Sequence, residues 1–192
     1  MGITVNDFFE NIYSVIFSPK AFFEREDLKI STRLATCTII FIAIITKLTV
    51  GIFNGDVRNI FFIFSLIGTI FATLLIWFLT ALFFEYIAKI FDKGGKLQKL
   101  LFLTAFVPVP YILFAPLNLL KQTGDIGYLF AVNLEFLLYL WIICLYAFSL
   151  RATYNLTLSR AFMLIFLPFI ASFFAMHWII GFAQKMWYIF SI

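Results

Sequence analysis

Residues 60–91 read IFFIFSLIGTIFATLLIWFLTALFFEYIAKIF, an apolar run in which the first charged side chain is Glu85. About 20 apolar residues are enough for a helix to cross the hydrocarbon core of a bilayer. This run is longer, because at 1.5 Å per residue it would extend about 48 Å across a core of about 30 Å. We therefore expect either a strongly tilted helix or, as we favour, last turns that place Glu85 and Lys89 in the cytosolic interface.

Four further segments have the same apolar character, at residues 34–53, 100–120, 128–150 and 161–183. Hydrophobic residues make up 64% of the 192-residue chain and charged residues 12%. Soluble domains average about 45–50% apolar and about 25% charged residues. The sequence therefore predicts an all-α polytopic membrane protein with five transmembrane helices.

The basic residues indicate how the five spans are oriented. One side of the membrane receives Lys20, Arg25, Lys29, Arg33, Lys89, Lys93, Lys96, Lys99, Arg151 and Arg160. The other side receives only Arg58, Lys121 and Lys185. Because cytosolic loops carry the excess of Lys and Arg, we expect a cytosolic N-terminus and a C-terminus outside. The opening residues lack a basic region followed by a short apolar core, so no cleaved signal peptide is expected.

The segment of residues 1–33 differs in kind from the predicted transmembrane domain, residues 34–192. Apolar side chains recur in it at helical spacing, at Val5, Phe8, Phe9, Ile12 and Ile16. This pattern predicts an amphipathic helix, and Ser18-Pro19 marks the start of a second, short one. The pattern fits a helix that lies in the membrane interface and equally a soluble helix packed on the cytosolic end of the bundle.

Three prolines, Pro108, Pro110 and Pro116, interrupt the third apolar segment. Each removes a backbone donor and bends the helix, so nearby carbonyls must find other partners. These carbonyls lie near Thr104, Phe106 and Ile112. One interpretation is a broken helix that lines a cavity, as in transporters, and the other is a kinked structural helix.

Lys47 is a charged residue inside an apolar run, where it costs roughly 2.5 to 3.5 kcal/mol on insertion scales. Counted at 1.5 Å per residue, Lys47, Glu135 and His177 lie about 5, about 6 and about 7 to 8 Å outward from the midpoints of their spans. This shared level predicts a buried pair of Lys47 and Glu135, with His177 as a third member. The cluster is either a structural pin or a proton or substrate relay.

The loop FDKGGKLQKL, residues 91–100, combines two glycines with three lysines: Lys93, Gly94, Gly95, Lys96 and Lys99. Glycine can end the preceding helix in left-handed geometry, and lysines suit an anionic cytosolic leaflet. We interpret the segment as a cytosolic loop that meets lipid headgroups. A phosphate-binding nest is an alternative, and the charge bias of cytosolic loops also accounts for the lysines.

The chain lacks the catalytic and metal-binding motifs that sequence can reveal. It has no GxxxxGK[ST], HExxH or GxSxG motif and no Cys/His cluster with metal spacing. The net charge of +4 comes without a basic groove with stacking aromatic residues, so no nucleic-acid partner is indicated. We expect no enzymatic activity, no cofactor and no metal. The bilayer is the expected partner, with other membrane proteins or a second copy of the chain as further candidates.

Three stretches occur in a characteristic order: IFSPKAFFERE (residues 16–26), FDKGGKLQKLLFLTAFVPVPYIL (91–113) and LWIICLYAFSLRATYNLTLSRAF (140–162). Together they resemble the Yip family of Rab-GTPase-interacting membrane proteins, especially its short prokaryotic members. The resemblance implies a five-helix fold with a cytosolic N-terminus. In eukaryotic relatives it implies roles in vesicle traffic and membrane shaping. Because the long N-terminal extension of those relatives is missing here, we expect a prokaryotic plasma-membrane protein.

Two functions follow from these features. The first is a non-enzymatic protein that organises the bilayer or partner proteins through its bundle and N-terminal helices. The second is a transporter or lipid translocator with a polar site near Lys47, Glu135 and His177. A water-filled cavity that reaches the level of Lys47 would favour transport, whereas a dry, packed bundle would favour organisation.

Overall fold

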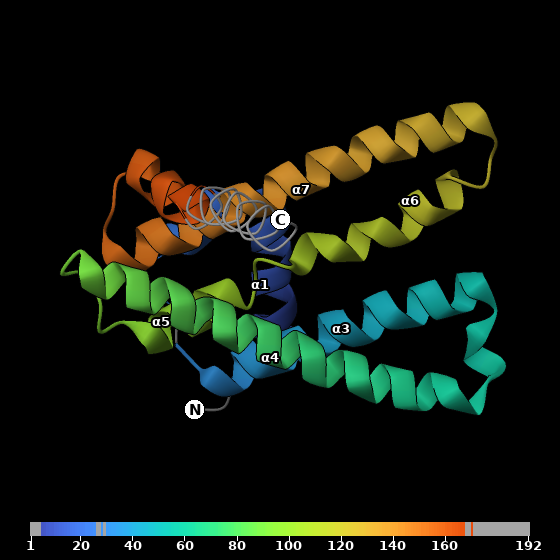
Figure 1. Ribbon diagram of the computed structural model, residues 1–192, viewed down its shortest axis with the longest axis horizontal. Helices are drawn as coiled ribbons and strands as arrows, with labels where there is room; N and C mark the ends of the chain where they lie inside the picture. Colours follow the sequence, from blue (N-terminus) through green and yellow to red (C-terminus); the bar gives the residue numbers. More distant parts are fainter. Residues whose placement is uncertain (1–4, 26–27, 29, 168–169, 171–192) are drawn as a thin grey trace, which may run out of the picture.

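The computed structural model describes residues 5–25, 28, 30–167 and 170, and this part of the chain is helical, without strands (Figure 1). Its α-helices are α1 (Val5–Phe17), α2 (Pro19–Glu24), α3 (Thr32–Asn54), α4 (Ile60–Ile90), α5 (Leu97–Thr104), α6 (Phe114–Leu120) and α7 (Asp125–Tyr154). Two 3-10 helices, η1 (Asp56–Arg58) and η2 (Val109–Leu113), lie between them, and a helix over Leu158–Leu167 follows α7.

Four helical stretches are long and apolar enough to cross a membrane: Thr32–Phe53, Ile60–Ile90, Leu97–Leu120 and Asp125–Tyr154. They match the first four predicted spans, so the prediction of an all-helical protein with several candidate spans is confirmed. The fifth predicted span, residues 161–183, begins in the Leu158–Leu167 helix, and most of it lies outside the described residues.

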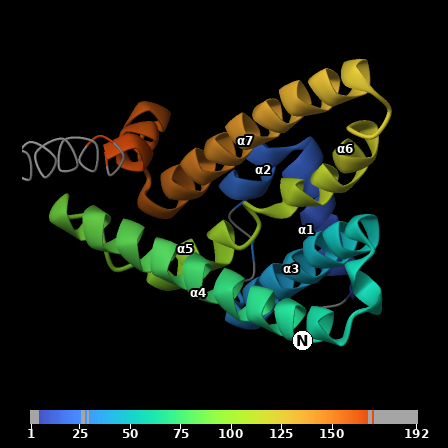
Figure 2. The same ribbon diagram turned by 45° about the vertical axis from the view of Figure 1, so that its right-hand side comes forward.

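The spans form two antiparallel hairpins, α3–α4 and α6–α7 (Figures 1 and 2). Gly55 ends α3 in left-handed geometry at φ 74°, and the Asn59 side chain accepts a 3.0 Å hydrogen bond from the N–H of Phe61 in the first turn of α4. In both views the hairpins diverge toward their loops. We call this the hairpin end (residues 54–59 and 121–125) and the opposite end the basic end (residues 30–33, 89–99 and 151–160).

The third span is broken into α5, η2 and α6, and it is the most deeply buried of the four. The carbonyls of Thr104 and Phe106 accept 3.2 Å hydrogen bonds from the N–H groups of Val107 and Val109. Tight 3-10-type turns thus satisfy the carbonyls that Pro108 and Pro110 free. Val107 and Val109 are fully buried in the main hydrophobic core, so the break is packed rather than open.

Helices α1 and α2 pack against the bundle with one face. Phe22 is fully buried, with its ring centroid 5.1 Å from that of Phe106, and the ring centroid of Phe8 is 5.3 Å from that of Phe41 on α3. The opposite face of α1 exposes three aromatic side chains, Phe9, Tyr13 and Phe17. The N-terminal segment therefore has two apolar faces, and only one of them is covered by the described part of the chain.

Candidate functional site

Glu85 is the most deeply buried charged residue of the described chain, with 4% of its surface exposed. It lies near the end of α4, where the Tyr154 hydroxyl donates a 2.6 Å hydrogen bond to Oε2 and the N–H of Gly95 donates one to Oε1. A buried carboxylate needs such donors to offset its desolvation. Glu85 therefore joins α4, the loop after it and the end of α7. Its carboxylate is buried in the protein and bonded to Tyr154 and Gly95, and it makes no ion pair with Lys89.

The loop after α4 turns in a way that serves this contact. The helix ends with Asp92 in left-handed geometry at φ 55°, and the N–H of Lys93 donates to the carbonyl of Ala88 at 2.9 Å. This is a Schellman ending, built on Asp92 and not on a glycine as expected. Gly95, at φ 89°, then turns its N–H toward Glu85. Because the Glu85 carboxylate accepts the hydrogen bond of that N–H, the donor is not free for a phosphate-binding nest.

The lysines of the loop separate into three environments. Lys96 is exposed at the start of α5, whereas Lys99 lines one cavity at the basic end and Lys93 lines another. The three side chains thus do not form a single cluster. Each can meet anionic groups at a different place on the basic end.

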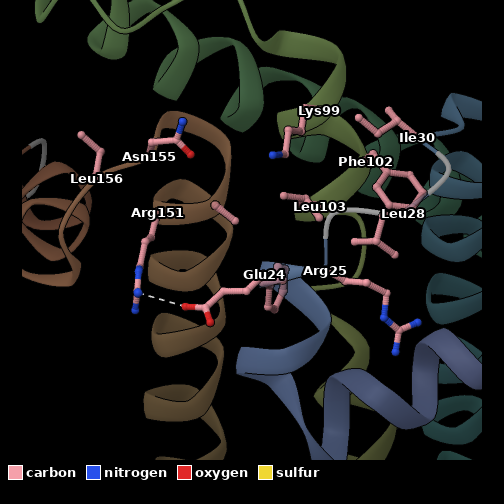
Figure 3. Close-up of a pocket in the computed structure, with 12 residues that line it drawn as sticks. Glu24, Arg25, Leu28, Ile30, Lys99, Phe102, Leu103, Arg151, Asn155 and Leu156 are labelled. Carbon is pink, nitrogen blue, oxygen red and sulfur yellow. Dashed lines mark ion pairs between the residues drawn. The ribbon is translucent and has the colours of Figure 1, made fainter.

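The larger of these two spaces lies among α2, α5 and the end of α7, and we call it the α2–α7 cavity (Figure 3). Its volume is about 450 Å³. Phe23, Phe102 and Leu103, each no more than 2% exposed, form its apolar floor. Its polar lining residues are Glu24, Arg25, Lys99, Arg151 and Asn155.

The charged groups of the α2–α7 cavity come from both of its sides. Figure 3 shows the Lys99 side chain of α5 directed toward Asn155, which follows α7, whereas the Arg151 side chain lies along α7 next to Glu24 and the Arg25 side chain points away from Lys99. The Arg151 guanidinium lies 2.9 Å from the Glu24 carboxylate, and these side chains are 36% and 39% exposed. An ion pair that is this open to solvent is weak, so Arg151 keeps donors for another anion.

The second cavity has a volume of about 430 Å³ and lies between the end of α4 and the Leu158–Leu167 helix. Ala88, Phe91, Met163 and Leu164 are among its apolar lining residues. Lys93 and Arg160 are its two charged lining residues. An apolar lining with two cations suits an amphiphilic molecule better than a small polar one.

The structure does not bring Lys47 and Glu135 together as an ion pair. Glu135 Oε1 lies 2.6 Å from Nζ of Lys121, whereas Lys47 Nζ lies 5.8 Å from the ring centroid of Phe62. The predicted Lys47–Glu135 pair is therefore wrong, because the two residues belong to different hairpins that diverge toward the hairpin end. His177, the predicted third member, lies outside the described residues.

A small cavity lies beside the residues that neighbour Lys47 on α3. Thr46 and Thr49 line it together with Tyr111 and Asn118, and its volume is about 10 Å³. This is room for about one water molecule. This cavity is far smaller than the two cavities at the basic end.

Sequence reasoning missed the partners of Glu85 and the contribution of Arg151. A carboxylate inside an apolar run, followed by a Gly-Gly pair, is a detectable signal for Glu85, since a buried acid needs donors nearby. The contact between Glu24 and Arg151 carries no local signal, because it joins segments far apart in the sequence.

A helical bundle with four candidate membrane spans, and with its cavities and buried polar contacts at one end, defines an integral membrane protein. The family profile of the Yip1 domain matches residues 13–179, so the chain belongs to the Yip1-domain family. The resemblance seen in the sequence is thereby confirmed. Comparison with curated proteins and with solved structures gave no match.

Proposed function

We propose that this Yip1-domain protein is non-enzymatic and organises the bilayer and partner membrane proteins, a second copy of itself among them. In this proposal residues 1–33 are an interfacial segment, and residues 34–192 form a five-helix domain of a prokaryotic plasma membrane. The N-terminus is cytosolic and the C-terminus outside, which the concentration of basic residues at the basic end supports.

The two apolar faces of α1 carry the proposal. Val15 is fully buried in the bundle, while Phe9, Tyr13 and Phe17 are 55%, 62% and 66% exposed on the other face. Burying a large apolar side chain is worth about 1.5–3 kcal/mol, so three exposed aromatic residues favour insertion into lipid. A helix that is fixed to the bundle and also inserts beside it displaces lipid in one leaflet only.

The packing near Lys47 supports organisation over transport. The cavity beside Thr46 and Thr49 has a volume of about 10 Å³, far below the roughly 300–1,000 Å³ of small-molecule sites. The proline-rich break at η2 is buried among core side chains, which suits the structural interpretation of the kinked third span. A transport path through these described residues would require them to move apart.

Reconstitution into liposomes tests the proposal. At increasing protein-to-lipid ratios, we expect the full chain to shift the vesicle size distribution measured by electron cryomicroscopy. A Phe9→Ser, Tyr13→Ser, Phe17→Ser variant should lose most of that shift, because its outward face no longer inserts. The matched control is Glu10→Gln, a change at an exposed polar position of the same helix.

Two results would count against the proposal. Vesicles of unchanged size at all ratios would show that the chain does not shape the bilayer. Movement of a fluorescent lipid or of protons across vesicles that contain the full chain, absent from empty vesicles, would favour the transport function instead.

A further inference from the structure

The α2–α7 cavity combines cations, an amide and an apolar floor at the end of the bundle where the spans leave the bilayer. Lys99 is in the first turn of α5, and Arg151 is in the last turn of α7. Their side chains therefore lie at the level where lipid headgroups meet the ends of these spans. The site is not part of the small cavity beside α3, and the sequence assigned lipid headgroups only to the loop of residues 91–100, not to Glu24, Arg25, Arg151 or Asn155.

The charge balance of the cavity favours an anion. Among the described residues that line it, Arg25, Lys99 and Arg151 are cationic and Glu24 is the single acid. Within the described residues, the only ion pair among these four is Glu24–Arg151. Lys99 thus lines the space without a carboxylate partner in the described part of the chain and is directed toward Asn155 (Figure 3). An ammonium and an amide on opposite sides of the space, with the Arg151 guanidinium also in its lining, suit the oxygens of a phosphate group.

The floor and the size of the cavity indicate what the phosphate is attached to. A free phosphate needs only a small polar site, whereas this cavity holds about 450 Å³ above Phe23, Phe102 and Leu103. An apolar floor next to cations suits a molecule with a polar head and a glycerol or acyl part. From this arrangement we propose that the α2–α7 cavity binds the phosphate group of an anionic phospholipid.

Glu24 limits the affinity of the site. Its carboxylate lies 2.9 Å from the Arg151 guanidinium and competes with phosphate for the same donors. Binding therefore exchanges one partner of Arg151 for another. The inference rests on the proposed function only in placing the basic end at a membrane surface, because a lipid that fills this cavity links α2, α5 and α7 next to the bilayer.

Lipid binding by the full chain in mild detergent tests the site, with bound phosphatidic acid, phosphatidylglycerol and phosphatidylcholine counted by native mass spectrometry. We expect the two anionic lipids to bind and phosphatidylcholine to bind weakly. Lys99→Met with Arg151→Met should weaken anionic lipid binding about tenfold or more, because two charged donors are lost. The matched control is Lys20→Met with Arg33→Met, which likewise removes one lysine and one arginine, from exposed residues that do not line the cavity.

A second variant separates a binding role from a merely structural one. Glu24→Gln breaks the ion pair with Arg151. If that pair only holds α2 in place, the variant should bind lipid more weakly, because α2 is then less firmly attached. The proposal predicts the opposite, a several-fold increase, because Arg151 loses its competing carboxylate. Tighter binding by Glu24→Gln together with weaker binding by the double variant supports the site even if the double variant is less stable.

Competition with inorganic phosphate identifies the source of the ligand. We expect millimolar phosphate to displace the lipid only weakly. If free phosphate binds as tightly as the anionic lipids, the ligand of the cavity is a soluble phosphate compound and not a lipid. Equal lipid binding by Lys99→Met with Arg151→Met and by the control Lys20→Met with Arg33→Met would overturn the site. Should this occur while the chain still changes vesicle size, the site fails and the proposed function stands.

Discussion

The hydroxyl of Tyr154, the last residue of α7, donates a 2.6 Å hydrogen bond to the buried carboxylate of Glu85 on α4. The two hairpins diverge toward the hairpin end, so this bond at the basic end joins the second span to the fourth. The N-H of Gly95 donates to the other carboxylate oxygen. The Glu85 side chain therefore links α4, the loop that follows it and the end of α7.

The first prediction concerns this contact. Tyr154→Phe should lower the free energy of unfolding by about 1–3 kcal/mol, because Glu85 loses a donor in a buried place. In a double-mutant cycle with Glu85→Gln, the two changes should couple by about 0.5–3 kcal/mol. Denaturant unfolding in detergent measures both. Tyr86→Phe is the control. Tyr86 lies next to Glu85 on α4 and is 68% exposed, so this change should affect stability little. Strictly additive losses would show that the hydrogen bond does not form.

The second prediction compares two glycines with opposite outcomes. Gly95 has φ 89°, so Gly95→Ala should destabilise the protein by about 1–2 kcal/mol through backbone strain. Gly68 lies within α4 with nothing within 4 Å of an added Cβ, so Gly68→Ala should stabilise it by about 0.5–1 kcal/mol. Thermal unfolding in one detergent compares them directly. Equal effects of the same sign would contradict the loop geometry.

The third prediction concerns the charges near the hairpin end. Lys121→Met and Glu135→Gln should couple by about 1 kcal/mol in a double-mutant cycle, because their charged atoms lie 2.6 Å apart. Lys47→Met with Glu135→Gln should be additive within about 0.5 kcal/mol, since Lys47 lies over Phe62 instead. Coupling in the second cycle, without coupling in the first, would support an ion pair between Lys47 and Glu135.

The fourth prediction tests the proposed orientation. A reporter that is active only outside the cytosol should give signal when fused after Ile192 and none when fused after Lys96, because the basic bias places these positions on opposite sides. Matching protein levels of the two fusions by immunoblot is the control. The reverse pattern would show the opposite topology, with the α2–α7 cavity at the outer surface of the membrane.

The sequence predicted those features that depend on one segment at a time. Hydropathy located the four candidate spans, and the three prolines located the break at η2, because both effects act along a single helix. The partner of Lys47 could not be predicted in this way. Depth is a count along one helix, whereas pairing depends on which helices are neighbours.

The burial of Glu85 was missed for a related reason. The sequence places it four residues before Lys89 on one helix face, in turns that we expected at the cytosolic interface. The structure covers it with Gly95 from the following loop and with Tyr154, which is 69 residues away in the sequence. Contacts of this kind follow from the three-dimensional arrangement and not from helical spacing.

The fifth prediction separates two phenylalanines of the N-terminal segment. Phe22 is fully buried against Phe106, so Phe22→Ala should destabilise the protein by about 3–5 kcal/mol in detergent. Phe9 is 55% exposed, so Phe9→Ala should change stability by less than about 0.5 kcal/mol.

In liposomes we expect Phe9 to contribute to the stability of α1, which hydrogen exchange of that helix measures. Phe9→Ala should weaken the protection of α1 from hydrogen exchange, because its ring contributes insertion into lipid. Glu10→Gln, at an exposed polar position of α1, is the matched control in the same liposomes. If Phe9→Ala leaves exchange in liposomes unchanged while Phe22→Ala raises it, α1 is held by the bundle alone. Its aromatic face then does not enter the bilayer, and the proposal that this helix shapes one leaflet would have to be abandoned.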